Sequence, residues 1–332
     1  TACKLFHLVR RLIAMEASNN IFTEVEILEA LKMLNSQDIY IISTGIIMGT
    51  IARIATLKVD FRQVPSYPTA YFNNIFLGFV AATLGSVAIP AILTGDFVAV
   101  TFLTVAVQQF RDVRVAERES LGKLEHTEYT QRGEAYIDGI AKTFESRNYI
   151  ALITSLVTVF VIEMLRKNNM IIAILCGVAA GAAAMILIYR FTKGKTVGEI
   201  CDVSPGQIEV RGSELFVDGM YVTNYLGTDR SRELFLKEGI AMVLTPKDHK
   251  SNITLENYGQ RQAILFEAVC IVGVKRYKFI RRNFETGKII ISFIPIDNDL
   301  EKAIKAVKHT PILENSRKIG RIMKSSGGSQ DE

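Results

Sequence analysis

The fold of this chain is decided by the run AYFNNIFLGFVAATLGSVAIPAILTG, which occupies residues 70–95 without a charged side chain. A second run, NNMIIAILCGVAAGAAAMILIY at residues 168–189, is equally free of charge. Each exceeds the roughly 18 to 20 apolar residues that indicate a bilayer-spanning helix. Two further apolar runs, 39–57 and 148–165, are each interrupted by one charged residue, Arg53 and Glu163. The sequence therefore predicts an integral membrane protein.

A third run, residues 97–110, is harder to assign because it holds only 14 uncharged residues. That is about 21 Å of helix at 1.5 Å per residue, against a hydrocarbon core of about 30 Å. Either this run crosses the membrane with Asp96 and Arg111 at opposite interfaces, or it is a re-entrant or interfacial segment. We therefore expect an α-helical membrane bundle of about five transmembrane helices, with the third left open between these two alternatives.

Small residues recur at helical spacing in two of the runs. Gly78 and Gly85 belong to the run at 70–95, and Gly177 and Gly181 to the run at 168–189. Small residues let helix backbones approach closely in lipid, so we expect these glycines at helix–helix contacts.

Lysine and arginine near the ends of the runs indicate the orientation. The loop at 111–147 carries seven basic residues, whereas the joint between the last two runs offers only Arg166 and Lys167. The C-terminal domain is then cytoplasmic in both alternatives, and the side of the N-terminus depends on the third run. The predicted division is an N-terminal helical extension at 1–38, a membrane domain at 39–190 that includes the charged loop at 111–147, a cytoplasmic α+β domain at 195–313, and a polar tail at 314–332.

Composition excludes several classes of function. The chain of 332 residues is 49% hydrophobic with a net charge of +5, and its basic residues have a sufficient role in membrane topology, so we expect the bilayer and no nucleic acid as a partner. The four cysteines and four histidines are scattered without metal-ligand spacing. Nucleotide-binding glycine loops, HExxH and GxSxG are missing, so we expect neither cofactor nor enzyme activity.

The charged loop contains a hexapeptide that is similar to a family motif. Its residues are Tyr136, Ile137, Asp138, Gly139, Ile140 and Ala141. It resembles the sequence after which the bacterial YIEGIA family of membrane proteins is named, with Asp138 where the name has glutamate. The stretches VDFRQVPSYP at 59–68 and VQQFRDVRVAERESL at 107–121 agree as well, so the likeness covers residues from about 40 onward. The resemblance implies an uncharacterised multi-span protein of the cytoplasmic membrane of spore-forming Firmicutes. A link to sporulation and a small companion subunit are further expectations from it. It supplies no reaction and no catalytic residues.

From about residue 195 the pattern changes to short β-rich runs separated by turns, as in a soluble α+β domain. The sequence predicts strands at 207–210, 214–217, 240–245, 277–282 and 288–294, and helices at 229–237, 260–272 and 298–308.

These observations favour a non-catalytic membrane protein, acting as a scaffold or as a subunit of a membrane assembly, as a homo-oligomer or with a companion subunit. The alternative is a channel or transporter-like subunit, because Thr101, Thr104 and Gln108 lie at i, i+3 and i+7 of the third run and so form a candidate polar pathway. Hydrogen bonding between helices explains the same spacing equally well. An intramembrane enzyme is the weakest hypothesis, because the sequence assembles no acid/base pair or activated nucleophile.

Overall fold

The computed structural model describes residues 36–60, 68–93, 97–167, 169–192 and 194–316. It divides the chain into two compact units. The first unit comprises the described parts of Thr1–Glu117 and Ala141–Lys193, and we call it the membrane unit because four of its helices are long and apolar enough to cross a membrane. The α+β unit comprises the described parts of Arg118–Ile140 and Gly194–Glu332. Residues 1–35 of the expected N-terminal extension and residues 317–332 of the expected tail lie outside the described residues.

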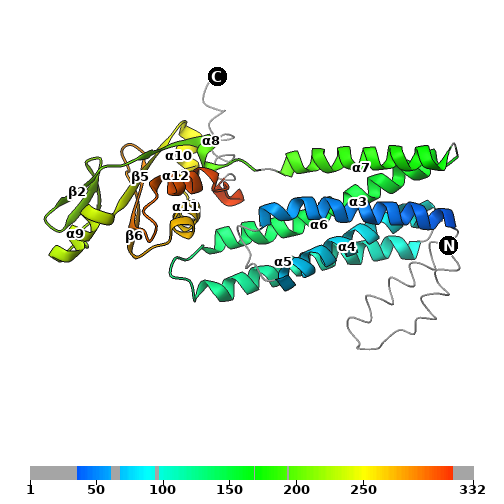
Figure 1. Ribbon diagram of the computed structural model, residues 1–332, viewed down its shortest axis with the longest axis horizontal. Helices are drawn as coiled ribbons and strands as arrows, with labels where there is room; N and C mark the ends of the chain where they lie inside the picture. Colours follow the sequence, from blue (N-terminus) through cyan, green and yellow to red (C-terminus); the bar gives the residue numbers. More distant parts are fainter. Residues whose placement is uncertain (1–35, 61–67, 94–96, 168, 193, 317–332) are drawn as a thin grey trace, which may run out of the picture. The chain divides into compact units, whose positions relative to one another are not determined.

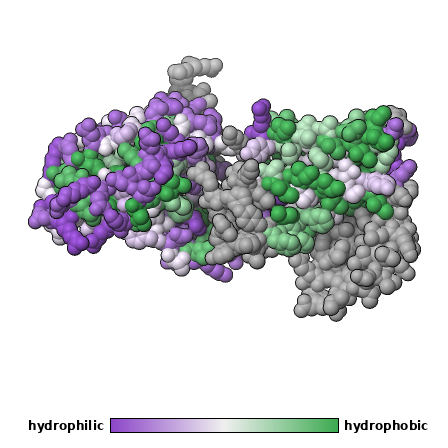
Figure 2. All heavy atoms as spheres, in the orientation of Figure 1, coloured by the Kyte–Doolittle hydropathy of each residue, from purple (hydrophilic) through white to green (hydrophobic). Residues whose placement is uncertain are grey.

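Five long helices supply the membrane unit (Figure 1): α3 (Ser36–Asp60), α4 (Pro68–Leu93), α5 (Phe97–Glu125), α6 (Glu134–Leu165) and α7 (Met170–Thr192). Four of them have the length and composition to cross a membrane, with candidate spans Gln37–Thr56, Asn74–Leu93, Glu134–Leu165 and Met170–Thr192. Among the described helices α5 does not meet this criterion, so four helices meet it where about five were expected. The physical reason is that α5 continues without a break from its 14 uncharged residues into the charged sequence that begins at Arg111. Figure 2 shows that the visible surface of this unit is mainly apolar.

Glycines allow the helices of the membrane unit to approach one another closely. A Cβ atom added at Gly85 of α4 would overlap the Leu152 carbonyl oxygen and the Ser155 hydroxyl of α6. On α7, a Cβ at Gly177 would overlap Ile162, and one at Gly181 would overlap the Thr158 hydroxyl.

Gly78 of α4 faces a side chain of another kind, because an added Cβ there would overlap Arg53 of α3. Arg53 is only 1% exposed, and its guanidinium donates to the carbonyl oxygen and to Oδ1 of Asn74, at 3.3 and 3.2 Å. All four glycines singled out from the sequence therefore lie at contacts within one chain, between α3 and α4, α4 and α6, or α6 and α7.

The α+β unit is built on an antiparallel four-stranded sheet in the order β1 (Cys201–Pro205), β5 (Ile240–Pro246), β7 (Ile289–Ile294) and β6 (Arg276–Arg282). A second, three-stranded sheet has the order β2 (Ile208–Arg211), β3 (Glu214–Val217) and β4 (Met220–Thr223). The helices are α8 (Val197–Ile200), α9 (Asp229–Glu238), α10 (His249–Glu256), α11 (Tyr258–Val272) and α12 (Leu300–His309).

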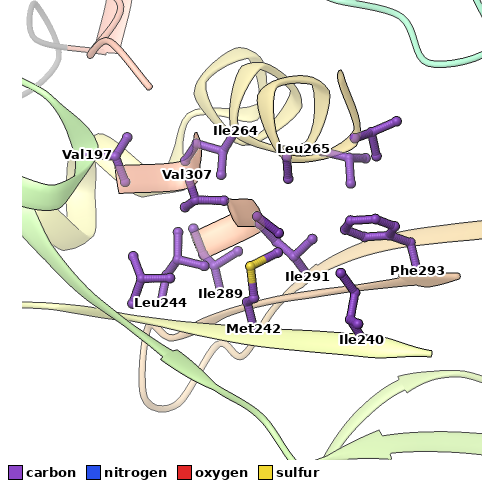
Figure 3. Packing of buried hydrophobic residues seen from close by; sticks show 14 of the residues in the cluster. Val197, Ile240, Met242, Leu244, Ile264, Leu265, Ile289, Ile291, Phe293 and Val307 are labelled. Carbon is purple, nitrogen blue, oxygen red and sulfur yellow. The ribbon is translucent and has the colours of Figure 1, made fainter. Parts of the chain in front are cut away.

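Both faces of the central sheet are covered, because successive residues of a strand point to opposite sides. Met242 and Ile291, which pair between β5 and β7, pack with α11 and α12 on one face (Figure 3). Val243 and Ile290, the next pair, belong to a second cluster with Phe235 of α9 and residues of β3 and β4. Since β7 is central and covered on both sides, all six of its residues are buried.

Candidate functional site: the Tyr136–Ala141 motif

The motif lies in the first turns of α6, directly after a tight turn from α5. Gly133 has a φ of +87°, a conformation that L side chains rarely adopt, and this explains the glycine there. Its carbonyl oxygen accepts hydrogen bonds from the amides of Tyr136 and Ile137 at 3.0 and 3.1 Å, and its own amide donates to Oε1 of Glu125 at 2.6 Å. The turn therefore fixes where α6 begins and which way the motif side chains point.

The apolar side chains of the motif and its tyrosine are buried in the α+β unit. Tyr136, Ile137 and Ile140 are 1%, 3% and 2% exposed. The hydroxyl of Tyr136 donates a hydrogen bond to Oε1 of Glu267 on α11, a side chain that is itself 6% exposed. The Tyr136 ring meets the ring of Phe266 edge-on, with the two centroids 6.1 Å apart. The motif tyrosine thus joins the α5–α6 turn to a helix of the C-terminal domain 131 residues later.

The residues before the motif reinforce this connection. The Arg132 guanidinium lies 4.9 Å from the centroid of the Phe266 ring, and the Gln262 amide donates to the carbonyl oxygen of Gln131 at 2.8 Å. Lys278 of β6 donates to the Tyr129 carbonyl and, at 3.0 Å, to the Thr130 hydroxyl. Burial lowers the pKa of Lys278 below its ordinary value. Residues 118–140 therefore fold with the C-terminal residues, although the whole loop 111–147 was predicted to belong to the membrane domain.

A pocket of about 480 Å³ lies where the first turns of α6 and α11 meet. A Cβ added at Gly259 would come within 2.8 Å of the Cβ of Ala135, so glycine allows the two helices to approach this closely. The pocket is lined by these two residues and by Arg118, Gly133, Glu134, Asp138, Tyr258, Gln262 and Asn315. Asp138 thus presents the motif's acidic group to the pocket, while the apolar members of the motif are buried.

Gln260 of α11 ties the segment after α12 to the same region. It is fully buried, donates from Nε2 to the Pro311 carbonyl oxygen at 3.1 Å, and accepts at Oε1 from the Leu313 amide at 2.7 Å and from the Ser316 hydroxyl at 3.3 Å. Residues 314–316, which the sequence analysis assigned to the polar tail, are therefore part of the α+β unit.

The candidate polar pathway lies on α5, in the membrane unit. Thr101, Thr104 and Gln108 are all exposed and lie on one side of the helix. Ala141, the last residue of the motif, is fully buried and is assigned to the membrane unit. The division between the units therefore falls inside the motif.

Glu267 was not among the site residues predicted from the sequence, although the sequence contains a signal for it. Glu267 is the one charged residue of the run AILFEAVCIV at 263–272, and a carboxylate in an apolar helix calls for a partner. Arg53, the charged residue that interrupts the run 39–57, is buried against α4. Within the described ranges, no group of three histidine, cysteine, aspartate or glutamate side chains is placed to hold a metal ion.

Fold and site together define a class of protein: a chain with four apolar helices compatible with membrane insertion, followed by an α+β region into which the α5–α6 turn is folded. Comparison with known sequences then identifies the family. The model of the YIEGIA family, described as "YIEGIA protein", matches residues 41–321, and the chain belongs to this family. The chain is also 37% identical over 288 residues to "Uncharacterized protein YphB" of Bacillus subtilis (strain 168), covering 85% of this chain and 94% of that protein. No solved structure matches the chain.

Proposed function

We propose that this protein is a non-catalytic component of a membrane assembly, a scaffold or subunit whose helical bundle holds the α+β domain at the cytoplasmic face of the cell membrane. The observation that carries this proposal is the folding of residues 118–140 into the α+β unit through Tyr136 and Glu267. The chain thereby passes between the two units three times, within α5, within α6 and after α7. A domain that is merely tethered needs a single link, so this connectivity supports a domain built into the membrane protein. The link to sporulation stays a prediction.

Contacts inside the membrane unit support a crossing by α5. Arg166, in the α6–α7 turn, pairs with Asp38 at 2.9 Å, so α3 starts at the end of the bundle where α6 finishes. Near its other end, α3 contacts the start of α4 through Arg53 and Asn74, so α4 returns to the first end.

The next helix must then connect the end where α4 finishes with the end where α6 starts, and that helix is α5. It runs antiparallel to α6, with Phe110 against Tyr149 (ring centroids 5.6 Å apart) and Arg114 paired with Glu145 at 3.0 Å. This supports five crossings, with the N-terminus on the non-cytoplasmic side.

The charge distribution supports the orientation. Arg111, Arg114, Arg147 and Arg190 lie toward the end of the bundle where α6 starts, and the α6–α7 turn carries Arg166 and Lys167. Basic residues are retained on the cytoplasmic side, so the end that leads into the α+β unit is the cytoplasmic one.

Single cysteines test the crossing of α5, in a background where the native cysteines are replaced. Leu93, at the end of α4, and Thr127, in the α5–α6 turn, are both exposed. We expect a membrane-impermeant maleimide to label Leu93→Cys from outside intact cells and Thr127→Cys only in inside-out vesicles. Lys167→Cys serves as the control and should label from outside. Labelling of residues 93 and 127 from the same side would contradict the crossing.

The channel or transporter-like subunit remains the second candidate function, favoured by the common side that Thr101, Thr104 and Gln108 share on α5. If these side chains line a pathway, replacing Thr104 and Gln108 by leucine abolishes ion flux in proteoliposomes. A tight barrier with the unmodified protein under every ion gradient would argue against this function.

A further inference from the structure

The outer surface of the membrane unit differs in chemistry between α5 and the other helices. Away from the helix ends, the large exposed side chains of α3, α4, α6 and α7 are aliphatic or aromatic; examples are Ile47, Ile51, Phe76, Phe79, Phe160 and Leu175. On α5 the exposed side chains at comparable depth include Thr101, Thr104 and Gln108. Four helices therefore present surfaces suited to lipid, whereas the exposed side chains that the structure describes in the uncharged run of α5 are all polar.

Of the three side chains, that of Gln108 has the most hydrogen-bonding groups. Its amide has two N–H donors and an accepting oxygen, and lipid tails offer no partner to any of them. Polar side chains of this kind stabilise helix pairs in membranes by hydrogen bonding across the contact. Gln108 therefore indicates that another helix covers this side of α5.

The spacing of the exposed residues describes the shape of that contact. Five of the exposed residues that the structure describes on α5 follow one another at intervals of three, four, three and four: Thr101, Thr104, Gln108, Arg111 and Val115. This is the heptad spacing of a left-handed helix pair, in which one narrow seam faces the partner along its whole length.

The charges on the seam identify the partner. Arg111 lies on the seam and Asp112, also exposed, lies directly beside it. Two copies inserted in the same orientation are related by a two-fold axis along the membrane normal, so their α5 helices run parallel, equal positions lie at the same height, and one flank of the seam meets the other flank of the partner's seam. Arg111 of each copy then faces Asp112 of the other, and the two Gln108 amides can donate to each other.

We propose that this side of α5 is the contact with a second copy of the same chain, forming a parallel two-fold pair. This inference rests on the proposed function, that the protein works in a membrane assembly, and it names the partner. The pathway residues Thr101 and Thr104 then lie at the dimer interface.

Disulfide crosslinking in native membranes tests the pair, again without the native cysteines. Gln108→Cys should give a dimer on a non-reducing gel after mild oxidation. Ile153→Cys is the matched control, because it is exposed on α6 close in sequence to Ala151 and Leu152, which pack with Phe110 of α5. It should stay monomeric. Equal crosslinking at the two positions, or none at Gln108→Cys, would overturn the proposal.

Charge reversal tests whether Arg111 of one copy contacts Asp112 of the other. Arg111→Asp and Asp112→Arg should each reduce the crosslinked fraction of Gln108→Cys by about three- to tenfold, and the double reversal should restore it. A single reversal without effect, or a double reversal that loses the crosslink further, would contradict the Arg111–Asp112 exchange and with it the parallel pair.

The mass of the purified particle in mild detergent shows how many copies it holds. It therefore tests the α5 pair separately from the proposed role in a membrane assembly. A particle of two copies agrees with both. A larger particle, or one that holds a smaller companion crosslinked through Gln108→Cys, would overturn the α5 pair and leave the assembly role standing. A single copy, with no crosslinked partner in cells, would overturn both.

Discussion

Replacing Gly85 with leucine should prevent the membrane unit from assembling. Even a single methyl group there would overlap the backbone carbonyl of Leu152 and the Ser155 hydroxyl. The carbonyl belongs to the α6 backbone and cannot turn away as a flexible side chain can. Overpacking of a rigid contact costs about 1 to 3 kcal/mol and sometimes more, and a leucine forces α4 and α6 apart along several turns. We expect a loss of more than about 3 kcal/mol, which is a large fraction of the stability of an ordinary domain.

Thermal stability in detergent, followed by size-exclusion chromatography of a fluorescent fusion, measures this effect. Ala183→Leu is the matched control, because Ala183 is exposed on α7 and an added leucine side chain there extends away from the bundle. The control should elute and melt as the unmodified protein does, while Gly85→Leu should elute as aggregate or melt many degrees lower. Equal melting of the two variants would show that α4 and α6 do not pack through Gly85.

The membrane helices were largely predictable from sequence because hydropathy depends on local composition. Runs around Gly85 and Gly181 could only be long apolar helices, and they are α4 and α7. What a run does not reveal is its neighbour. The contact between Gly78 and Arg53 joins two runs through a buried arginine, which hydropathy does not predict. Helix α5 is not apolar enough over its length to be identified as a membrane span, because its second half is charged.

The α+β unit was predicted where local signals were strong. Thr228 caps α9 and accepts a hydrogen bond from the Ser231 amide at 3.3 Å, and the predicted strands at 207–210, 214–217, 277–282 and 288–294 form the pairs β2–β3 and β6–β7. Strand β1 was missed because its sequence, CDVSP, holds only two buried residues and ends in proline, as edge strands do. Strand β4, with the sequence MYVT, was missed because its burial does not alternate: its last two residues, Val222 and Thr223, are both buried.

The motif itself was recognised as a sequence, but its structural partner was not predictable. Tyr136 and Glu267 are 131 residues apart, and no periodic pattern connects a loop between two membrane helices with an apolar helix of the C-terminal domain. Long-range pairs of this kind depend on the tertiary fold. They carry consequences that a single substitution can test.

Tyr136→Ala should destabilise the α+β unit strongly. The substitution removes a ring that is 1% exposed, its edge contact with Phe266 and its hydrogen bond to Glu267. Truncation of a large buried aromatic residue costs about 3 to 5 kcal/mol. Tyr136→Phe keeps the ring and removes only the hydroxyl, so it should cost about 1 to 3 kcal/mol, the range for leaving a buried acceptor with one hydrogen bond fewer.

Cys201 provides the measurement, once the other three cysteines are replaced by serine. It is 1% exposed in β1, and burial raises the pKa of its thiol to about 12. The thiol is therefore almost entirely protonated at pH 8 in the folded unit, whereas an unfolded cysteine has a pKa of about 8.5. Labelling of Cys201 by a maleimide therefore reports opening of the α+β unit in the full-length protein.

Labelling of Cys201 should be fastest in Tyr136→Ala, intermediate in Tyr136→Phe, and unchanged in Tyr258→Phe, whose ring is 71% exposed. A double substitution with Glu267→Gln separates the pair from its surroundings: if the two side chains act through one hydrogen bond, Tyr136→Phe should cost less in that background. Labelling of Tyr136→Ala at the unmodified rate would mean that the motif only lies against the domain. The expected order would instead show that the α5–α6 turn is part of the domain's own fold, and that the stability of the C-terminal α+β unit depends on the motif for which the family is named.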